Sequence, residues 1–175
     1  MDKTSKHDQI PINFAFCNKK TLENYIAGGN QQLVDALKLF ASENLGQLIY
    51  VYGKKSTGKS HLCKAVFDII VDNKVYVDQH NFKLLSNIDI QNTQYLIIDD
   101  FDAILEKENT EDLLFYCINE FILSKKSILI SSIKSTEEID FIKNDLKSRL
   151  TSYLIFNIKE ISDDQKIKVV KKITE

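Results

Sequence analysis

Apolar residues recur along this chain in two patterns, one typical of amphipathic helices and one typical of buried strands. After the loop at residues 53–58, apolar side chains stand at positions i, i+3, i+4, i+7 and i+8, which predicts a helix with one buried face. Similar spacing predicts helices from Asn30 onward and over residues 110–124. Short runs of aliphatic, β-branched and aromatic residues predict buried strands. The five predicted strands are "QLIYVY" (47–52), "KVYVD" (74–78), "QYLIID" (94–99), "SILISS" (127–132) and "SYLIFNI" (152–158).

The order of these elements indicates the fold class. Strands that alternate with helices are typical of a parallel sheet with helices on both faces. The length of 175 residues fits one domain around one core. We therefore predict an α/β fold whose five-stranded parallel sheet is sandwiched by helices. Residues 1–20 are expected to form an N-terminal arm, and Ser162 is expected to cap a helix that runs to the last residue.

Composition narrows the class of protein. Hydrophobic residues make up 43% and charged residues 27% of the chain, which excludes wholesale disorder. The net charge of −2 offers no broad electrostatic attraction for nucleic acid, so we expect little or no direct DNA binding. No apolar run approaches the roughly 18 residues of a membrane span, and the N-terminus lacks the apolar segment of a secretory signal. We expect a cytoplasmic protein without a membrane partner.

The three cysteines, Cys17, Cys63 and Cys117, are odd in number and widely spaced. This favours reduced thiols over a disulfide framework or a zinc site. Cys63 and Cys117 fall at apolar positions of predicted helices, so we expect both to pack in the core.

The clearest chemical motif lies between the first strand and the helix that follows it. "GKKSTGKS" matches G-x-x-x-x-G-K-[ST] at every fixed position and stands in the strand-loop-helix context that phosphate binding requires. Lys59 is expected to reach the β- and γ-phosphates, and the Ser60 hydroxyl to ligate Mg²⁺. A chance glycine turn is the alternative. The predicted nucleotide-binding residues are Gly53, Lys54, Lys55, Ser56, Thr57, Gly58, Lys59 and Ser60.

A pair of acidic residues follows the third predicted strand. A P-loop needs a carboxylate at the tip of a neighbouring strand to hold the hydrated metal, and Asp99 is in that position. We expect Asp100 to orient or deprotonate the attacking water, and Asp102 to be a surface charge. A strand that ends in solvated acids is the alternative interpretation.

Arg149 is the only arginine, against 22 lysines. Its planar guanidinium suits a phosphate or a carboxylate, and a structural salt bridge is the simpler interpretation from the residues alone. The stretch "QIPINF" at residues 9–14 is likewise open. Its alternating apolar residues fit either an ordinary N-terminal arm or a peptide that binds another protein.

These motifs together resemble the AAA+ module of the DnaA family, across nearly the whole chain. Residues 19–37 are similar to the family's segment beside the adenine pocket, and "LIIDDFDAI" is similar to its Walker B motif. "DLKSRL" resembles the box whose arginine acts on the ATP of a neighbouring subunit. The resemblance implies ATP or ADP as the ligand. It also implies that Arg149 works in trans on the γ-phosphate of a partner.

Within the family, the chain looks most like the Hda-like regulators, which begin with a sliding-clamp-binding peptide. Residues 9–14 resemble that peptide. The resemblance implies that Gln9 bonds the rim of the clamp's cleft and that apolar side chains fill it. The implied partners are the DNA polymerase sliding clamp and a DnaA-type initiator. The partner-binding residues expected on this basis are Gln9, Ile10, Ile12 and Phe14.

Two departures from the family pattern concern the nucleotide site. Ile133 stands where the family usually has the sensor-one aspartate, and Ser131 and Ser132 are the candidate substitutes. Residues 21–175 form the expected AAA+ base domain, which ends in what would be the first helix of the α-helical lid. We therefore expect the lid to be absent or truncated.

The leading hypothesis is a clamp-docked regulator that promotes ATP hydrolysis by the DnaA initiator and so restrains replication initiation. Its own ATPase activity would be weak or dependent on a partner, and nucleotide-dependent self-association is a further expectation. The alternatives are a self-sufficient P-loop ATPase of helicase-loader type and a truncated adaptor that does not hydrolyse ATP.

Overall fold

Five parallel strands form one sheet in the computed structural model, which describes residues 20–43 and 45–162. The strand order is β2-β3-β4-β1-β5, and every neighbouring pair is parallel. All five strands predicted from the sequence are present, with ends that differ by no more than two residues, so the predicted α/β fold is confirmed. The strands are β1 (Leu48–Tyr52), β2 (Lys74–Val77), β3 (Tyr95–Ile98), β4 (Ser127–Ser132) and β5 (Leu154–Asn157).

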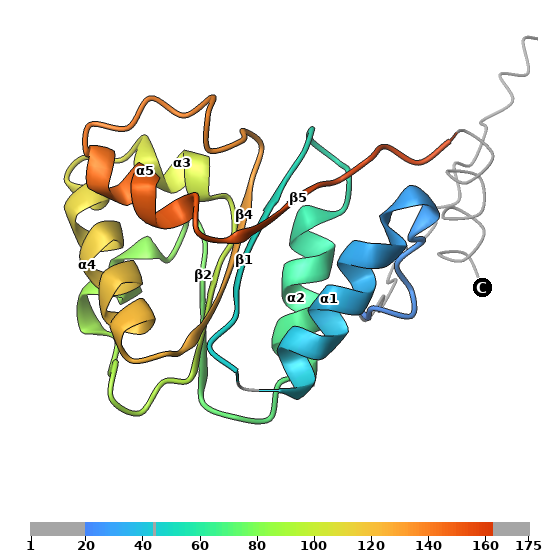
Figure 1. Ribbon diagram of the computed structural model, residues 1–175, viewed down its shortest axis with the longest axis horizontal. Coiled ribbons are helices and arrows are strands. Elements are labelled where there is room, and N and C mark those ends of the chain that lie inside the picture. The colour runs from blue at the N-terminus through green and yellow to red at the C-terminus, as the bar shows by residue number, and fades with distance from the viewer. Residues whose placement is uncertain (1–19, 44, 163–175) are drawn as a thin grey trace, which may run out of the picture.

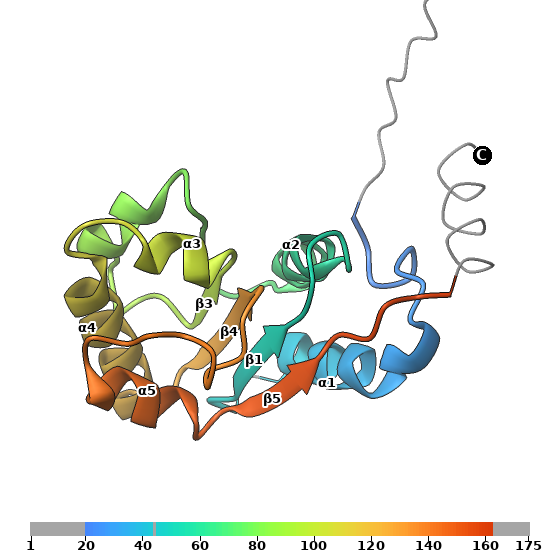
Figure 2. The same cartoon turned by 90° about the horizontal axis from the view of Figure 1, so that it is seen from above.

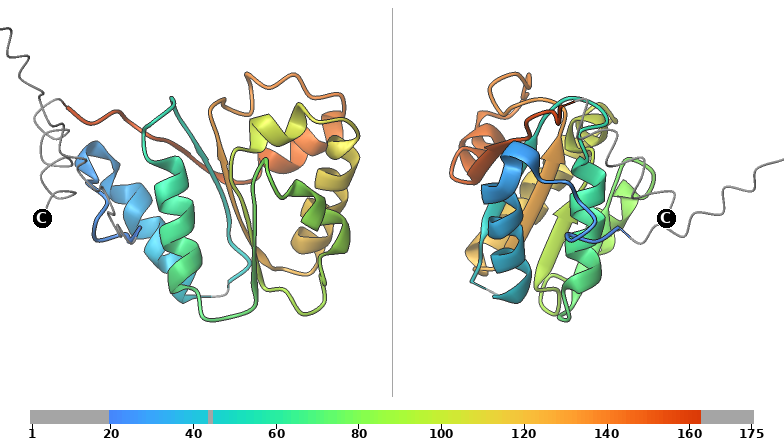
Figure 3. Two further views of the ribbon diagram at one scale, coloured as in Figure 1. Left: turned by 180° about the vertical axis from the view of Figure 1, so that it is seen from behind. Right: turned by 90° about the vertical axis from the view of Figure 1, so that its right-hand side faces the viewer.

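Helices cover both faces of the sheet (Figure 1). Two α-helices pack against the core on one face and three against the core on the other. The two layers are seen from above (Figure 2) and from behind (Figure 3). The face with two helices carries α1 (Gln31–Ser42) and α2 (Lys59–Ile69). The other face carries α3 (Phe101–Leu105), α4 (Thr110–Leu123) and α5 (Asn144–Leu150). Two 3₁₀ helices complete the fold, η1 (Gly28–Asn30) and η2 (Phe82–Asn87).

Each face of the sheet has its own apolar core. Successive residues of β1 alternate between them, with Ile49 packed toward α1 and α2 and Tyr50 toward the other helices, because strand side chains point to opposite faces in turn. Every residue of β3 and β4 is buried, since both strands are paired on both edges and covered on both faces. Cys63 and Cys117 are buried, one in each core, as predicted.

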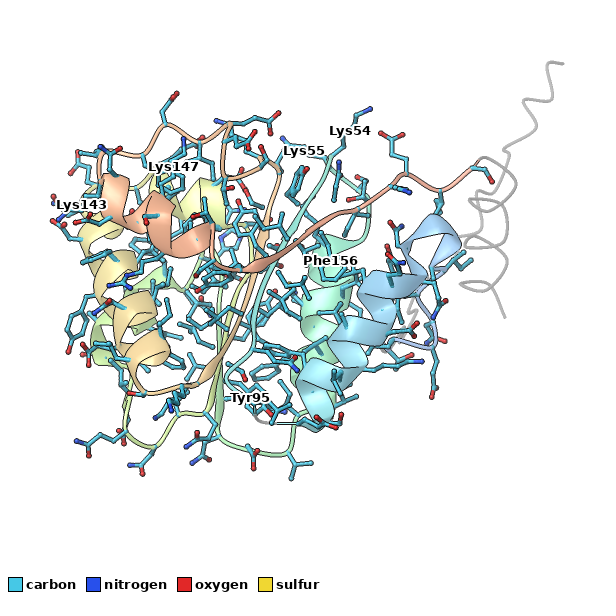
Figure 4. The ribbon with its side chains drawn as sticks, viewed as in Figure 1. Lys54, Lys55, Tyr95, Lys143, Lys147 and Phe156 are labelled. Atoms are coloured by element: carbon cyan, nitrogen blue, oxygen red, sulfur yellow. The ribbon has the colours of Figure 1, made fainter. Side chains whose placement is uncertain are left out.

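The carboxyl ends of the strands meet at one edge of the sheet. The Gly53 amide at the end of β1 donates a hydrogen bond to the Ser132 carbonyl at the end of β4, at 3.2 Å. Figure 4 shows Lys54 and Lys55 at this edge, and Tyr95, the first residue of β3, at the opposite one. Ligand sites of open α/β sheets form outside the carboxyl ends of the strands. The polar residues that follow these strands therefore gather where a site is expected.

Four short elements were not predicted, namely η1, η2, α3 and α5. They have three, six, five and seven residues, which is too short for the helical repeat to show above the surrounding sequence. Residues 1–19, which include the predicted binding peptide at 9–14, and residues 163–175, which include the helix predicted after Ser162, lie outside the described residues. No helix of residues 20–43 and 45–162 is long and apolar enough to span a bilayer.

Candidate functional site

A cavity of about 670 Å³ lies at the carboxyl ends of the strands. We call it the P-loop cavity. Its size falls within the range of roughly 300–1,000 Å³ that is usual for small-molecule sites. Its walls come from the P-loop and the first turn of α2, from Gln79 after β2, from Asp100 and Asp102 after β3, and from Ile133 and Lys134 after β4.

The P-loop has the backbone geometry that its glycines allow. Gly58 has a φ of 97°, in the left-handed region that favours glycine. A Cβ atom at Gly58 would lie 2.7 Å from the ring of Tyr25, and one at Gly53 would lie 3.1 Å from the Ile158 carbonyl oxygen. The loop is therefore packed closely from both sides, by the segment before α1 and by the segment after β5.

Lys59 is the first residue of α2, and its side chain folds back onto the loop. Its ammonium donates hydrogen bonds to the carbonyls of Gly53 at 2.6 Å and Lys54 at 2.7 Å. Burial lowers the pKa of Lys59, and the nearby carboxylates of Asp102, Asp100 and Asp99 oppose that shift. Because an ammonium has three donors, one N–H is left for a ligand in the cavity.

The predicted nucleotide-binding residues do not all face the cavity. Lys55, Ser56, Gly58, Lys59 and Ser60 line it, whereas Gly53, Lys54 and Thr57 do not. Lys54 instead forms an exposed ion pair with Glu160 at 2.8 Å. Thr57 donates to the Lys54 carbonyl at 2.9 Å and so shapes the loop from within.

Asp99, which the sequence predicts to hold the metal, does not line the cavity and is 2% exposed. Its Oδ2 accepts a hydrogen bond from the Tyr76 hydroxyl at 2.7 Å, and its Oδ1 accepts from the Ser131 hydroxyl and from the Asp100 amide. These donors hold a buried carboxylate at the junction of β2, β3 and β4, where its charge acts on Lys59 and Asp100.

Asp100 presents its carboxylate to the cavity from a left-handed backbone with φ of 54°. Burial raises the pKa of Asp100, and the charges of Asp99 and Asp102 raise it further, while Lys59 opposes the shift. A half-buried carboxylate with a raised pKa beside a phosphate-binding loop is the kind of group that takes a proton from water.

Asp100→Asn is expected to raise the free energy of unfolding at pH 7 by roughly 0.5–1 kcal/mol. Because the pKa of Asp100 is raised in the folded state, the neutral acid stabilises the fold at pH values below the unfolded-state pKa. This stabilisation is lost as the pH rises through the folded-state pKa. The gain should therefore shrink as the pH falls to about 4. Thermal unfolding at both pH values measures it, with the exposed Asp140→Asn as the control. A variant that is less stable than the wild type at pH 7 would contradict the expectation.

The prediction that Asp102 is a surface charge is wrong. Its Oδ1 accepts hydrogen bonds from the Ser132 hydroxyl at 3.0 Å and the Ile133 amide at 2.9 Å. Ser131 and Ser132 are both fully buried, and their hydroxyls bond Asp99 and Asp102 instead of lining the cavity. Neither serine faces a ligand in the place of the sensor-one aspartate. The two serines fix the carboxylates of β3 and α3 to the end of β4.

Arg149 stands apart from these residues, near the end of α5. Its side chain is exposed and does not line the P-loop cavity. In the part of the chain that the structure describes, its guanidinium forms no ion pair. The structural salt bridge considered from the sequence is therefore not formed with any described residue.

Gln79, Glu106 and Lys134 line the cavity and were not singled out from the sequence. Each follows a strand or a short helix, and no motif marks them. Their position in the sequence could have indicated two of them, since Gln79 and Lys134 stand two residues beyond β2 and β4. Ligands of parallel sheets bind beyond the carboxyl ends of the strands.

The segment before α1 closes one side of the site. The Asn30 side chain donates to the Lys159 carbonyl at 2.9 Å and accepts from the Lys159 amide at 2.8 Å. His61 bonds the Thr21 carbonyl at 2.8 Å, so its Nε2 carries the proton, and its ring lies 5.9 Å from that of Tyr25. His61 also lines the P-loop cavity.

Comparisons with known proteins agree with this geometry. A family model described as the bacterial DnaA ATPase domain matches residues 16–157. An uncharacterised protein of Haemophilus influenzae is 29% identical, over 93% of this chain and 73% of its own length. The chromosomal replication initiator protein DnaA of Lachnoclostridium phytofermentans is 27% identical, and the match covers 89% of this chain but only 39% of that protein.

Among solved structures, AMPPCP-bound DnaA from Aquifex aeolicus superposes with a TM-score of 0.73 at 26% identity. The match covers 87% of this chain and 53% of that one. This chain thus spans about half of that structure and about two fifths of the initiator from Lachnoclostridium.

Proposed function

The chain belongs to the bacterial DnaA ATPase domain family, and from that membership we propose that it binds ATP or ADP with Mg²⁺ and regulates replication initiation through a DnaA-type initiator. The observation that carries this proposal is the P-loop cavity, which is lined by Lys59 and Ser60 at the start of α2 and by Asp100, which lies between β3 and α3. A helix N-terminus, an ammonium and a carboxylate are the groups that a nucleotide phosphate with its metal requires.

The residues present fit such a ligand. Lys59 keeps one donor for the phosphates, and Ser60 offers a hydroxyl to the metal from the cavity wall. Asp99 adds a buried carboxylate, held by Tyr76 and Ser131, whose charge acts on Lys59 and Asp100. Among the described residues, no group of three or more His, Cys, Asp or Glu side chains is arranged to hold a metal ion. Mg²⁺ commonly takes its other ligands from substrate phosphates and water, so a metal at this site arrives with the nucleotide.

The position of Arg149 supports an action on a partner. An exposed guanidinium outside the chain's own cavity is free to reach the nucleotide of another subunit. Arginines supplied in trans stabilise the charge that develops on a transferring phosphoryl group. We propose that Arg149 acts in this way on an ATP-bound initiator, and that the chain thereby promotes hydrolysis by that initiator.

We further propose that residues 9–14 dock on the sliding clamp, as in the Hda-like branch of the family. These residues lie outside the described part of the chain, so the proposal depends on their sequence. Gln9 supplies an amide for the rim of a cleft, and the apolar side chains of Ile10, Ile12 and Phe14 supply burial. Pro11 limits the conformational entropy lost on docking.

Direct titration of the purified chain against the sliding clamp of its own organism tests this docking. We expect a dissociation constant in the low micromolar range or tighter, and loss of binding in the double variant Gln9→Ala/Phe14→Ala. Lys6→Ala, in the same arm, is the matched control and should bind as the wild type does. Absence of binding by the wild type would make residues 9–14 an ordinary arm, while the nucleotide proposal would stand.

A self-sufficient ATPase is the second candidate, and the raised pKa of the cavity-facing Asp100 favours it. In that case the chain alone would hydrolyse ATP, and Asp100→Asn would remove the activity. The regulator hypothesis differs in placing the hydrolysed ATP on the initiator.

A further inference from the structure

The buried carboxylate of Asp99 has a hydrogen-bond partner on an edge strand of the sheet. The hydroxyl of Tyr76, on β2, donates to Asp99 Oδ2 at 2.7 Å. We infer that Tyr76 is a positioning residue that fixes the Asp99 carboxylate for an interaction with the water shell of nucleotide-bound Mg²⁺. This inference rests on the proposed nucleotide binding, and it assigns part of the metal dependence of that binding to a residue outside the P-loop cavity.

The register of the sheet brings the two side chains together. Tyr76 pairs with Ile97, and Asp99 stands two residues beyond Ile97. Strand side chains two residues apart point to the same face, so Tyr76 and Asp99 share the face that α1 and α2 cover. The Asp99 amide donates to the Val77 carbonyl at 2.8 Å, which continues the pairing of β2 with β3 to the residue that carries the carboxylate.

The ring of Tyr76 is held against α2, the helix that begins at the P-loop. The rings of Tyr76 and Phe67 lie 5.7 Å apart between centroids, in an edge-on arrangement. The Lys64 ammonium lies 5.8 Å from the Tyr76 centroid, within the range of a cation–π contact. Both contacts involve the ring and not the hydroxyl. Tyr76→Phe would therefore keep this packing and lose the bond to Asp99.

The hydrogen bonds of Asp99 leave one of its acceptor positions open. An ionised carboxylate has about four such positions, two on each oxygen. Oδ1 accepts from the Ser131 hydroxyl and, at 3.1 Å, from the Asp100 amide. Among the described residues, Oδ2 accepts from Tyr76 alone. The open position is therefore on the oxygen that Tyr76 holds, and a metal-bound water can donate to it.

The burial of Asp99 favours an indirect action on a metal. Its side chain does not line the P-loop cavity, but its charge acts on Lys59 and Asp100, which do. Mg²⁺ that binds with substrate phosphates usually keeps several waters, so a carboxylate behind the cavity wall can interact with it through one of them. Removing the hydrogen-bond partner of a group around a metal typically lowers metal affinity by about 10–100-fold.

Isothermal titration of the full chain with ADP, in EDTA and over a series of Mg²⁺ concentrations, tests the inference. Tyr76→Phe should raise the Mg²⁺ concentration that gives half of the gain in ADP affinity by about 10-fold, because the carboxylate is no longer fixed. Its ADP affinity in EDTA should change by no more than about 2-fold, since the lost bond concerns the metal. The exposed Tyr116→Phe on α4 is the matched control and should follow the wild type in both conditions.

A double-mutant cycle with Asp99→Asn determines whether Tyr76 acts through Asp99. Asp99→Asn alone should lose most of the Mg²⁺-dependent gain. Adding Tyr76→Phe should then change the Mg²⁺ response by no more than about 2-fold, since the carboxylate that Tyr76 holds is already absent. Effects of the two substitutions that multiply would mean that Tyr76 acts independently of Asp99, and would overturn the inference.

A melting curve for each variant separates positioning from a purely structural bond. The inference is overturned if Tyr76→Phe melts at a lower temperature but keeps the Mg²⁺ response of the wild type. A wild type whose ADP affinity does not depend on Mg²⁺ would also overturn it, and would leave the proposed nucleotide binding intact. A wild type that binds no ADP in either condition would end both proposals.

Discussion

Lys59→Ala should weaken the binding of both ATP and ADP by at least about 100-fold, because it removes the ammonium that the P-loop holds for the phosphates. The Gly53 and Lys54 carbonyls that accept from Lys59 would remain and would face the phosphates without a cation between them. Isothermal titration with each nucleotide measures the loss, and Lys38→Ala on the exposed side of α1 is the control.

One outcome would contradict the expected loss of nucleotide binding in Lys59→Ala. If Lys59→Ala binds either nucleotide with wild-type affinity, the phosphate site is not in the P-loop. A melting curve accompanies the titration, because Lys59 is 6% exposed and its removal leaves space in the loop. A folded variant that has lost both nucleotides supports the proposed site, whereas an unfolded one calls for Lys59→Met, which keeps the length of the side chain.

Arg149→Ala should reduce the chain's stimulation of ATP hydrolysis by the initiator about 1,000-fold or more, the range that arginine fingers supply in trans. Its own nucleotide affinity should not change, because Arg149 does not line the P-loop cavity. Single-turnover hydrolysis by ATP-loaded initiator, with the sliding clamp and each variant present, provides the measurement. Arg149→Lys should fail to restore the activity, because an ammonium lacks the planar fork of the guanidinium.

Lys147→Ala is the matched control for this experiment, since Lys147 lies two residues away on α5 (Figure 4). It tests whether positive charge on α5 is sufficient. Undiminished stimulation by Arg149→Ala would remove the finger assignment, and equal losses in both variants would indicate general electrostatic attraction instead.

The sheet could be predicted from the sequence because its central strands are buried on both faces. β3 and β4 are buried at every position, and such strands read as short, continuous apolar runs. The order of the strands could not be obtained in this way, since the apolar pattern records burial and does not record which strand pairs with which.

The nucleotide site was predictable only where a motif marks it. Lys59, Ser60 and Asp100 were identified from their spacing and do meet at one cavity. The error at Asp102 has a physical cause. The residue bonds Ser132 and Ile133, about 30 positions away, and only the pairing of β3 with β4 brings these residues together. Lys134 was missed for the same reason, because its place in the cavity wall depends on the pairing of β4 with the strands beside it.

The hydrogen bonds between Asn30 and Lys159 join residues 129 positions apart, and so connect the segment before α1 with the segment after β5. Contacts of such long sequence separation form late in folding, because the loop between them must be closed first. The wall of the P-loop depends on this closure, since Ile158 packs against Gly53 and Tyr25 against Gly58. During synthesis, the walls of the P-loop are therefore complete only after β5 and Lys159 have left the ribosome. The P-loop cavity is thus expected to form late in the folding of a nascent chain.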